Sequence, residues 1–277
     1  MPGELGRIAT NLNSLSGLMQ LNSLNAKLGV TMERISSGQK VNRAADDPAS
    51  FALGRKQTVK INFLQSSQSN IREASSMLQV AESQQGRAQD LLMDITSDLQ
   101  RAMSSTVGAT ERAVINTKLQ QYVSEIRDIA KNTKFNGVKL LSAASMNFLI
   151  QVGETGADVL TATVSGVGAN GLGISGVSCS TRTAASAALS AITKAVSSLT
   201  IRRENIGARM SRLGQKLDGL GVDILNTQAA RSLYLDADIA QEEVSLVKYQ
   251  ILQSATVSML SQANSAPQTL LQLLPRG

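Results

Sequence analysis

The sequence predicts a mainly α-helical protein, a long antiparallel helical bundle or coiled coil with a small β-hairpin region in the middle of the chain. Apolar residues recur at spacings of three and four over four long stretches, which is the pattern of one helix face. Aromatic residues make up 3% of the chain, so Leu, Ile, Val, Ala and Met supply the apolar surface, as in long, thin helical packing. Residues 138–200 are poor in charge and rich in Gly, Ser, Thr and Ala. We expect this stretch to be a turning point between two helical ends that run back side by side.

The first helical stretch is expected to place its apolar residues on one stripe, formed by Leu12, Leu15, Leu18, Leu21, Leu24, Leu28, Met32 and Ile35. The first 30 residues contain only Glu4, Arg7 and Lys27 as charges, which is too little polarity for a solvated surface helix. Two interpretations stay open for the terminal stripes. They could form an intramolecular coiled coil, or a helix pair that becomes ordered only against other copies.

The second and third helices are expected at residues 48–105 and 111–132. Pro48 suits a first helical turn, where its missing N–H costs nothing, and Asp46 or Asp47 can cap that helix. The Asn-Gly pair at 136–137 strongly favours a turn and ends the third helical pattern.

The middle of the chain reads as a hairpin over "FLIQVGETGADVLTATV". Its two strands are expected to turn one face each to the core, formed by Phe148, Ile150, Val152, Leu160, Ala162 and Val164. A final helical region is expected at 183–274. Gly219, Gly221 and the acidic step "YLDAD" at 234–238 are expected to loosen it.

Composition excludes most kinds of catalytic site. The chain has no His and a single Cys, Cys179, so it can form no Ser-His-Asp triad, Cys-His pair, His-ligated zinc site or internal disulfide. We expect no catalytic residue, no cofactor and no metal site. The net charge is +6, but basic residues are neither in runs nor interleaved with aromatic ones, so we expect no nucleic-acid binding.

No stretch approaches the roughly 20 apolar residues of a membrane span, and no membrane insertion is expected. The N-terminus also lacks a basic region followed by an apolar core and a small-residue cleavage site. A protein of this kind is expected to leave the cell, if it does, without a cleaved signal peptide.

Residues 35–48, "ISSGQKVNRAADDP", could be a phosphate-binding loop, a calcium loop or a structural corner. A phosphate loop needs more Gly and a GK[ST] ending. A calcium loop needs Asp or Asn at alternate positions and a terminal Glu. The stretch has neither, and a structural corner buried by assembly fits it best.

Five segments, in order along most of the chain, carry a resemblance. They are "NLNSLSGLMQLNSLNAKLG", "MERISSGQKVNRAADDPASFALG", "TKFNGVKLL", "IQVG" and "YQILQSATVSMLSQANSAPQTLLQLL". With them the chain resembles bacterial flagellin, the subunit of the flagellar filament. The resemblance implies a secreted, self-assembling structural molecule for motility, found in the extracellular filament, and no enzyme.

The resemblance also implies a division of the chain. The expected segments are an inner-core helix at 1–35, a spoke connector at 36–48, outer-core helical parts at 49–137 and 183–234, a short β-hairpin and loop region at 138–182, and a C-terminal inner-core helix at 235–277. Many flagellins carry a large insertion where this chain has only its short middle segment. We therefore expect the core domains with almost no further decoration.

The resemblance assigns assembly to the inner-core helices, through Leu12, Leu15, Leu18, Leu21, Leu24, Leu28, Ile251, Leu252, Met259, Leu260, Leu270, Leu271, Leu273 and Leu274. It assigns the spoke connector to Ser36, Ser37, Gly38, Lys40, Asn42, Arg43, Asp46, Asp47 and Pro48. Within the connector, Gly38 would allow a tight reversal, the two Asp would cap the next helix, and the basic residues would pair with acidic groups on neighbouring subunits.

The implied partners are other copies of the chain in a helical homopolymer, the flagellar export apparatus with a secretion chaperone, and cap and hook-associated proteins. Some flagellins are read by an innate immune receptor through an Arg-containing segment, and "MDITSDL" at 93–99 aligns there. The receptor-equivalent residues are Asp94, Ile95, Thr96 and Asp98. Because Thr96 occupies the basic position, weak receptor recognition is expected.

Two other functions stay open at this point. A hook–filament junction protein of the same superfamily shares both terminal regions, and "DDP" and "RRENIGARMSRL" have some of its character. Against it stand "FNGVKLL" and "IQVG", which are flagellin features. A helical signalling or adaptor rod is more remote, because it leaves the connector and the hairpin without a role.

Overall fold

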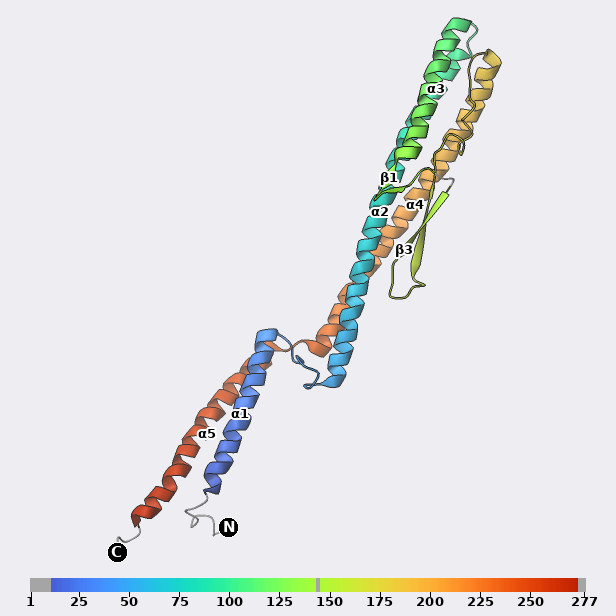
Figure 1. Ribbon diagram of the computed structural model, residues 1–277. Helices are drawn as coiled ribbons and strands as arrows, with labels where there is room; N and C mark the ends of the chain where they lie inside the picture. The colour runs from blue at the N-terminus through green and yellow to red at the C-terminus, as the bar shows by residue number, and fades with distance from the viewer. Residues whose placement is uncertain (1–10, 143–144, 274–277) are drawn as a thin grey trace. The chain divides into compact units, whose positions relative to one another are not determined.

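The computed structural model describes residues 11–142 and 145–273, with side chains described as far as Ser265. The elements, in chain order, are α1 (Leu12–Ser37), α2 (Pro48–Ala102), α3 (Ala109–Asn132), β1 (Lys134–Phe135), β2 (Val138–Lys139), β3 (Ser145–Gln151), β4 (Val159–Ser165), α4 (Arg182–Leu235) and α5 (Ile239–Leu273) (Figure 1). The predicted fold class, long helices with a small β region in mid-chain, is confirmed.

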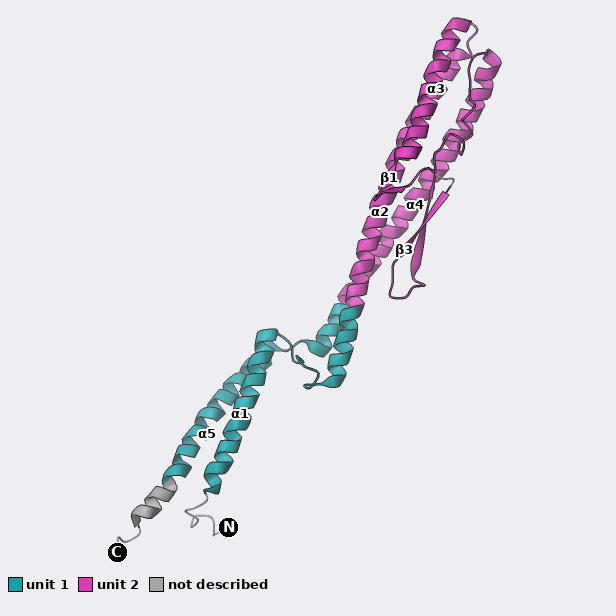
Figure 2. Ribbon diagram, in the orientation of Figure 1, with its two compact units in different colours: residues 1–59, 227–277 teal, residues 60–226 magenta. Residues whose placement is uncertain are grey.

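The chain divides into two compact units, and each is formed from both halves of the sequence (Figure 2). Unit 1 comprises residues 1–59 and 227–277, and therefore contains α1, α5 and the segments that join them to the long helices. Unit 2 comprises residues 60–226 and contains α3, all four strands and most of α2 and α4.

Unit 2 has a continuous hydrophobic core. α2, α3, α4 and the β3–β4 hairpin all contribute to it, and its fully buried large side chains include Ile71, Leu78, Leu92, Ile95, Leu99, Leu119, Ile126 and Ile192. These residues recur along each helix at spacings of three, four and seven, the pattern that predicted the helices. Aliphatic side chains fill the core because three long helices side by side leave a narrow space between them.

The β3–β4 hairpin is antiparallel and confirms the predicted faces. Phe148 lies opposite Ala162 and Ile150 opposite Leu160, so these side chains share the face that turns toward the core. Leu149, on the other face, is 71% exposed. A shorter turn precedes the hairpin, where Asn136 and Gly137 both adopt positive φ, 48° and 81°, between β1 and β2. That is the Asn-Gly turn the sequence predicts.

The extended segment 151–179 is fixed to the helices mainly by side-chain donors. Amide and guanidinium groups of the helices donate to its backbone carbonyl groups: Asn70 to Gln151, Arg209 to Thr161, Gln85 to Ser165 and Gln120 to Val177. Near the end of the segment the Cys179 amide donates to Asn116 at 2.9 Å, and the Cys179 side chain is fully buried. These bonds satisfy backbone groups that have no partner strand.

The last helical region breaks at one of the two predicted places. α4 ends at Leu235 and α5 begins at Ile239, so the acidic step separates them, and Asp238 Oδ1 accepts from the Gln241 amide at 3.2 Å. The prediction that Gly219 and Gly221 loosen the helix is wrong, because α4 continues through both. Leu220 between them is buried in the core, and packing of this kind outweighs a glycine penalty of about 1 kcal/mol.

The sequence predicted that no stretch is long and apolar enough to span a membrane, and α4 requires a correction to that prediction. Within the described part of the chain it is the one helix with an 18-residue window apolar enough to cross a membrane, at a mean hydropathy of 1.3. Helices of soluble proteins with a face in the core pass the same test. In α4 the face formed by Ala185, Ala188, Ile192, Ala195 and Leu199 lies in the core of unit 2.

Candidate functional site

The paired terminal helices of unit 1 form the first part of the candidate site. α1 and α5 lie side by side and antiparallel (Figure 1). Polar side chains fix their register: Asn11 Nδ2 donates to the Ala263 carbonyl at 2.7 Å, and Gln253 Nε2 donates to Asn25 Oδ1 at 2.7 Å. Near the other end of the pair, Arg34 forms an ion pair with Glu242 at 3.2 Å.

The face of α1 that meets α5 buries few residues. Leu24, Leu28 and Thr31 are buried there, one turn apart. Gly17 lies on the same face, and a Cβ at Gly17 would lie 3.3 Å from Leu260 Cδ1, so the two helices approach closely at that point. Two buried leucines and a threonine form a small core for a 26-residue helix.

α1 carries a second apolar face on its opposite side. At 3.6 residues per turn, Leu12, Leu15, Met19 and Val30 project away from the Leu24–Leu28 face. All four side chains are exposed. The expectation of a single stripe from Leu12 to Ile35 is therefore wrong, because a spacing of three or four residues drifts around the helix over several turns.

α5 repeats this arrangement. Val244, Val247, Ile251 and Met259 lie within about four turns of α5, on the side opposite Glu242 and Gln253, which contact α1. Their exposures are 64%, 53%, 64% and 71%. A helix that is apolar on both sides belongs in a core, and exposed apolar faces of this extent mark interaction sites.

The predicted assembly residues fall into three groups. Leu24 and Leu28 are buried between the helices, and Leu21 and Leu260 are half-buried. Leu12, Leu15, Leu18, Ile251, Leu252 and Met259 are exposed. The side chains of Leu270, Leu271 and Leu273, and the whole of Leu274, lie outside the described residues.

The connector after α1 is joined to the segment between α4 and α5 by main-chain hydrogen bonds. Gly38 ends α1 in the left-handed conformation, with φ 70°. Its carbonyl accepts from the Ala237 amide at 2.9 Å, and the Lys40 amide donates to the Leu235 carbonyl at 2.8 Å. Gln39 and Asp236 thereby form an antiparallel bridge. The Lys40 ammonium donates to the Leu233 carbonyl at 2.9 Å, so it too lies against α4.

The two adjacent aspartates of the connector have different roles. Asp47 Oδ1 accepts from the Ala49 and Ser50 amides at 3.1 and 3.2 Å, so Asp47 caps α2 ahead of Pro48 as predicted. The expectation that Asp46 also caps α2 is wrong. Asp46 Oδ2 accepts from the Arg43 and Asn42 amides at 2.9 and 3.0 Å, so it closes the turn before the helix.

These amide donors act on the pKa of both carboxyl groups. The backbone N–H of Arg43 lowers the pKa of Asp46 below its usual 3.8, and hydrogen bonds from Ser50 lower the pKa of Asp47 in the same direction. A carboxylate that accepts several N–H bonds is stabilised in its charged form. The turn and the helix start therefore depend on ionised aspartates.

The other predicted connector residues have local partners. Arg43 pairs with Glu33 at 3.0 Å, and the Asn42 amide group reaches the Glu33 carbonyl at 3.5 Å. Ser37 Oγ accepts from the Gln39 amide, and Ser36 is exposed. The pairing of Lys40 and Arg43 with neighbouring subunits stays a prediction. Among the described residues no group of His, Cys, Asp or Glu side chains could hold a metal ion.

The sequence reasoning missed how closely α2 and the end of α4 approach. A Cβ at Gly54 would lie 2.4 Å from Leu235 Cγ, so no side chain fits there. Gly54 sits inside a helix, and an isolated helical glycine is the signal that could have identified this contact. The Gln39–Asp236 bridge has no comparable signal, because neither residue type favours pairing.

The receptor-equivalent segment lies on α2 in unit 2. Ile95 is fully buried in the core, and Asp94 is exposed. Thr96 Oγ1 donates to the Leu92 carbonyl at 2.9 Å, and Asp98 pairs with Lys118 of α3 at 2.8 Å. Its four predicted residues therefore do not share one exposed surface.

Comparison with known families identifies both ends of the chain. Residues 8–146 match the bacterial flagellin N-terminal helical region, and residues 189–274 match the bacterial flagellin C-terminal helical region. The chain belongs to the bacterial flagellin family. The two matches account for α1 to β2 with the start of β3, for most of α4 and for α5. Only 147–188 lie between them, so the chain consists of the core regions of the family.

Individual relatives agree with this assignment. A flagellar filament 30.7 kDa core protein of Treponema maltophilum is 30% identical to this chain. The alignment covers 95% of this chain and 98% of the length of that protein. Bacillus subtilis flagellin is 29% identical over 97% of this chain and 99% of its own. Among solved structures, Bacillus cereus flagellin aligns with 55% of this chain and 88% of its own, at 23% identity and a TM-score of 0.49.

Proposed function

We infer that this chain is a structural subunit of the bacterial flagellar filament, an extracellular polymer, and not an enzyme. The observation that carries this function is the apolar face that α1 and α5 each keep exposed on the side away from their partner. Inside a polymer of identical chains, these faces bury one another. Family membership and the names of the relatives, flagellar filament core proteins and flagellins, agree.

The energetics favour assembly through unit 1. Fully burying an aliphatic side chain contributes about 1.5–3 kcal/mol, while association costs roughly 4–15 kcal/mol in lost freedom and ordering. Four exposed apolar side chains on the outer face of each helix are enough to offset that cost when several neighbours bury them together. A single isolated chain gains nothing from them.

The domain roles follow from this proposal. Residues 1–35 and 235–277 act as inner-core helices, 36–48 as the spoke connector, 49–137 and 183–234 as the outer core, and 138–182 as its β-hairpin and loop region. The small core between α1 and α5 supports the further proposal that this pair is loosely ordered in the monomer and becomes fixed in the filament.

The finer partners belong to the same proposal. The chain is exported through the flagellar export apparatus. A secretion chaperone covers the exposed apolar faces beforehand, because these faces would otherwise associate prematurely. Cap and hook-associated proteins contact the polymer at its ends. Nucleic acid and membrane lipid have no part in this function. None of the observations favours the hook-associated alternative.

The decisive test is seeded polymerisation of the purified full-length chain. Electron microscopy and pelleting of the polymer are expected to show long filaments that extend from the seeds. Short closed assemblies that stop growing would point to a junction protein. A chain that stays monomeric at every concentration and with every seed would contradict the proposal.

Weak stimulation of the innate flagellin receptor is also proposed. An arginine would offer charge-assisted, bidentate bonds, each worth about 1.5–3 kcal/mol. The Thr96 hydroxyl proton is already donated to Leu92 within the helix, and Asp94 adds negative charge. A cell reporter is expected to respond at least about tenfold less to this monomer than to its Thr96→Arg, Asp94→Arg variant.

The matched control for that assay is Thr117→Arg on α3, because Thr117 makes the same intrahelical bond, to the Ala113 carbonyl. This variant is expected to leave the response unchanged. Strong signalling by the unmodified monomer would rule the proposal out.

A further inference from the structure

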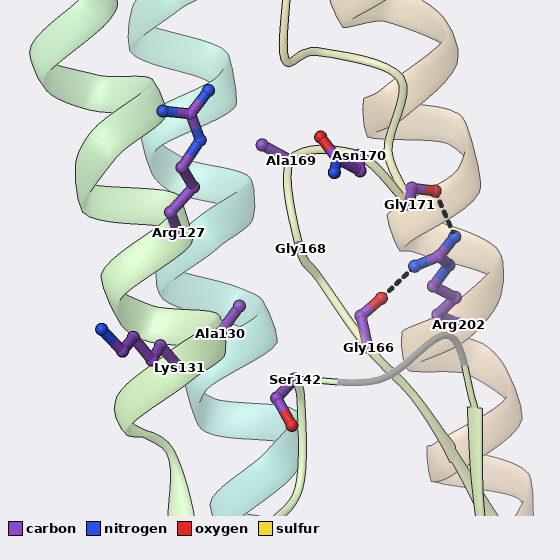
Figure 3. A pocket seen from close by; sticks show the side chains of 10 residues that line it. All are labelled: Arg127, Ala130, Lys131, Ser142, Gly166, Gly168, Ala169, Asn170, Gly171 and Arg202. Carbon is purple, nitrogen blue, oxygen red and sulfur yellow. Dashed lines mark hydrogen bonds between the residues drawn. The ribbon is translucent and has the colours of Figure 1, made fainter.

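Unit 2 contains a hollow of about 510 Å³ (Figure 3). It lies between α3 and the glycine-rich loop 166–171 that follows β4, with α4 behind the loop. Arg127 and Lys131 reach it from α3, and Arg202 reaches it from α4. Its size is within the range of small-ligand sites.

The lining of this hollow has one sign of charge. It holds the three cations and no acidic residue. α3 also carries Glu125 and Asp128, but these line a separate hollow of about 320 Å³, together with Arg87 and Lys134. The two hollows share α3, and Asp128, which is three residues before Lys131 and so next to it on the helix surface, lines only the smaller one. Within the described residues none of the three cations forms an ion pair.

Arg202 is held by carbonyl groups of the loop and by no acidic side chain of the described residues. Its guanidinium is partly buried and donates to the carbonyl groups of Gly166 and Gly171, the second at 3.0 Å. Burial lowers the pKa of Arg202, but a guanidinium remains charged at neutral pH. A cation removed from water is normally paired with an anion, and here only neutral carbonyl groups compensate it.

The loop carbonyl groups already accept hydrogen bonds, whereas several loop amides have no described acceptor. The carbonyl groups of Gly168, Ala169 and Asn170 accept from the amides of Leu172, Ile174 and Gly173. Those of Gly166 and Gly171 accept from Arg202. No described group accepts a hydrogen bond from the amides of residues 168–171. Amide donors without a described acceptor suit an oxyanion.

The two cations of α3 are not needed to hold the loop. Asn116 and Gln120 bind the returning segment at Cys179 and Val177, and Arg127 makes only a long bond of 3.4 Å to the Ser175 carbonyl. Lys131, one turn further along α3, has no described partner. Both residues line the hollow and are exposed; in Figure 3 the Lys131 ammonium points away from the loop, so this flexible side chain has to turn to meet a ligand.

We propose that this hollow binds a phosphate-class oxyanion, either free or carried on a small organic molecule. Arg127 and Lys131 contact its oxygen atoms from α3, and the loop amides and Arg202 contact it from the other side. Arginine forks and amide groups suit the geometry and charge of a phosphate group.

Titration of the monomeric full-length chain with inorganic phosphate tests the proposal, with chloride used to match the ionic strength. Amide resonances of Gly168, Asn170 and Gly171 are expected to shift saturably, while light scattering confirms in the same sample that the chain stays monomeric. Shifts that follow ionic strength alone, or that spread evenly over the surface, would overturn the proposal.

Matched variants localise the binding. Arg127→Gln, Lys131→Gln is expected to weaken phosphate binding at least about tenfold, because two charge-assisted contacts are lost. Arg87→Gln, Lys134→Gln removes the same charge from the neighbouring hollow and is expected to leave the affinity within about twofold. Equal losses in both variants would reduce the effect to net charge and contradict a site.

The single variant Lys131→Gln keeps the test valid if the double variant misfolds. Lys131 is exposed, and no described group forms a hydrogen bond or ion pair with its side chain. The variant is expected to weaken binding severalfold with unchanged circular dichroism.

Glucose 6-phosphate, with glucose as the neutral control, distinguishes an organic phosphate from the free phosphate ion. Tighter binding than inorganic phosphate assigns the site to an organic phosphate, and equal binding assigns it to the free ion. Absence of binding by both would overturn the proposal.

Discussion

Unit 1 and unit 2 are built from the same kind of helix and bury very different amounts of it. In unit 2, α2, α3, α4 and the hairpin surround a continuous core with many fully buried Leu and Ile side chains. In unit 1, α1 and α5 bury Leu24 and Leu28 between them and leave a second apolar face of each helix exposed. The difference lies in the number of layers. A pair of helices can cover only one side of each helix, whereas three helices and a hairpin enclose a core.

The comparison separates two uses of an apolar helix. Unit 2 uses its apolar residues to fold, and unit 1 retains most of its own for other copies. Both uses give the same periodicity in the sequence, so the distinction appears only when each helix is given its neighbours.

The largest effect is expected from charges placed on the outer face of α5. The triple variant Val244→Asp, Ile251→Asp, Met259→Asp is expected to abolish filament formation. Each exposed side chain contributes little to the monomer, but would bring a buried, unpaired carboxylate into the polymer. Pelleting and electron microscopy measure assembly, and thermal unfolding of unit 2 is expected to be unchanged.

The control places one such charge on an exposed apolar position of unit 2. Val114 is 67% exposed on α3, and Val114→Asp is expected to assemble more readily than the triple variant. Normal filaments from the triple variant would show that the outer face of α5 is not used.

A smaller but measurable difference is expected for leucine deletions. Leu119→Ala in unit 2 is expected to lower the free energy of unfolding by about 2–5 kcal/mol, since it leaves a cavity in a packed core. Leu24 in unit 1 is 2% exposed, yet Leu24→Ala is expected to leave the main unfolding transition of the monomer nearly unchanged. Chemical denaturation followed by circular dichroism compares the two, and equal losses would mean that the units unfold together.

Glycine substitutions in unit 1 are expected to act through the connector. Gly38→Ala places a side chain at φ 70° with nothing within 4 Å, so its cost is strain alone, about 1–2 kcal/mol. That strain is expected to raise the critical concentration for assembly about 5–30-fold. Gly54→Ala is expected to raise it further, because the new Cβ overlaps Leu235.

Gly29→Ala is the matched control for both, since Gly29 lies within α1 at ordinary φ with nothing within 4 Å. It is expected to assemble at the same concentration or a lower one, as alanine favours helix. If all three variants behaved alike, the connector geometry would have no special role.

The smallest effect is expected from pH near neutrality. The chain has no His, so assembly is expected to be flat between about pH 6 and 8. The folded-state pKa values of Asp46 and Asp47 are lowered, so their stabilisation is present above the unfolded value near 4 and is lost as the pH falls through the folded values below 3.8.

In unit 2 the Thr155 hydroxyl lowers the pKa of Asp158 in the same direction, so both units are expected to lose stability in acid. Critical concentration against pH reports on unit 1, and melting temperature reports on unit 2. A steep transition of either quantity near pH 7 would contradict this account. Asp46→Asn, Asp47→Asn is expected to remove the acid sensitivity of assembly in part.

The helices and the hairpin could be predicted because each follows from local chemistry. Pro48 and Asp47 define a helix start, Asn136–Gly137 defines a turn, and the alternation around Ile150 defines a strand face. Each of these signals lies within a few residues of the structure it determines. The relation between α1 and α5 rests on contacts more than 200 positions apart, such as Arg34 with Glu242.

What could not be predicted depends on packing at that long range. The sequence interpretation placed Leu12 and Leu24 on one stripe, although helix geometry turns them apart, and only the structure shows that α5 covers Leu24 and leaves Leu12 exposed. Asp46 and Asp47 look interchangeable in the sequence. In the structure Asp46 accepts hydrogen bonds from the turn before α2, whereas Asp47, one residue later, caps the helix. The α4 glycines were misjudged because the core around Leu220 holds the helix despite them.

The buried thiol of Cys179 gives the molecule a built-in reporter. It is the single cysteine of the chain, it is fully buried in unit 2, and burial raises its pKa above the usual value. A thiol reagent reacts with the thiolate, so native chains are protected and only chains that have opened locally become labelled. The rate of modification therefore acts as a clock for the opening of unit 2. It can be read in monomer and filament alike without adding any probe to the sequence.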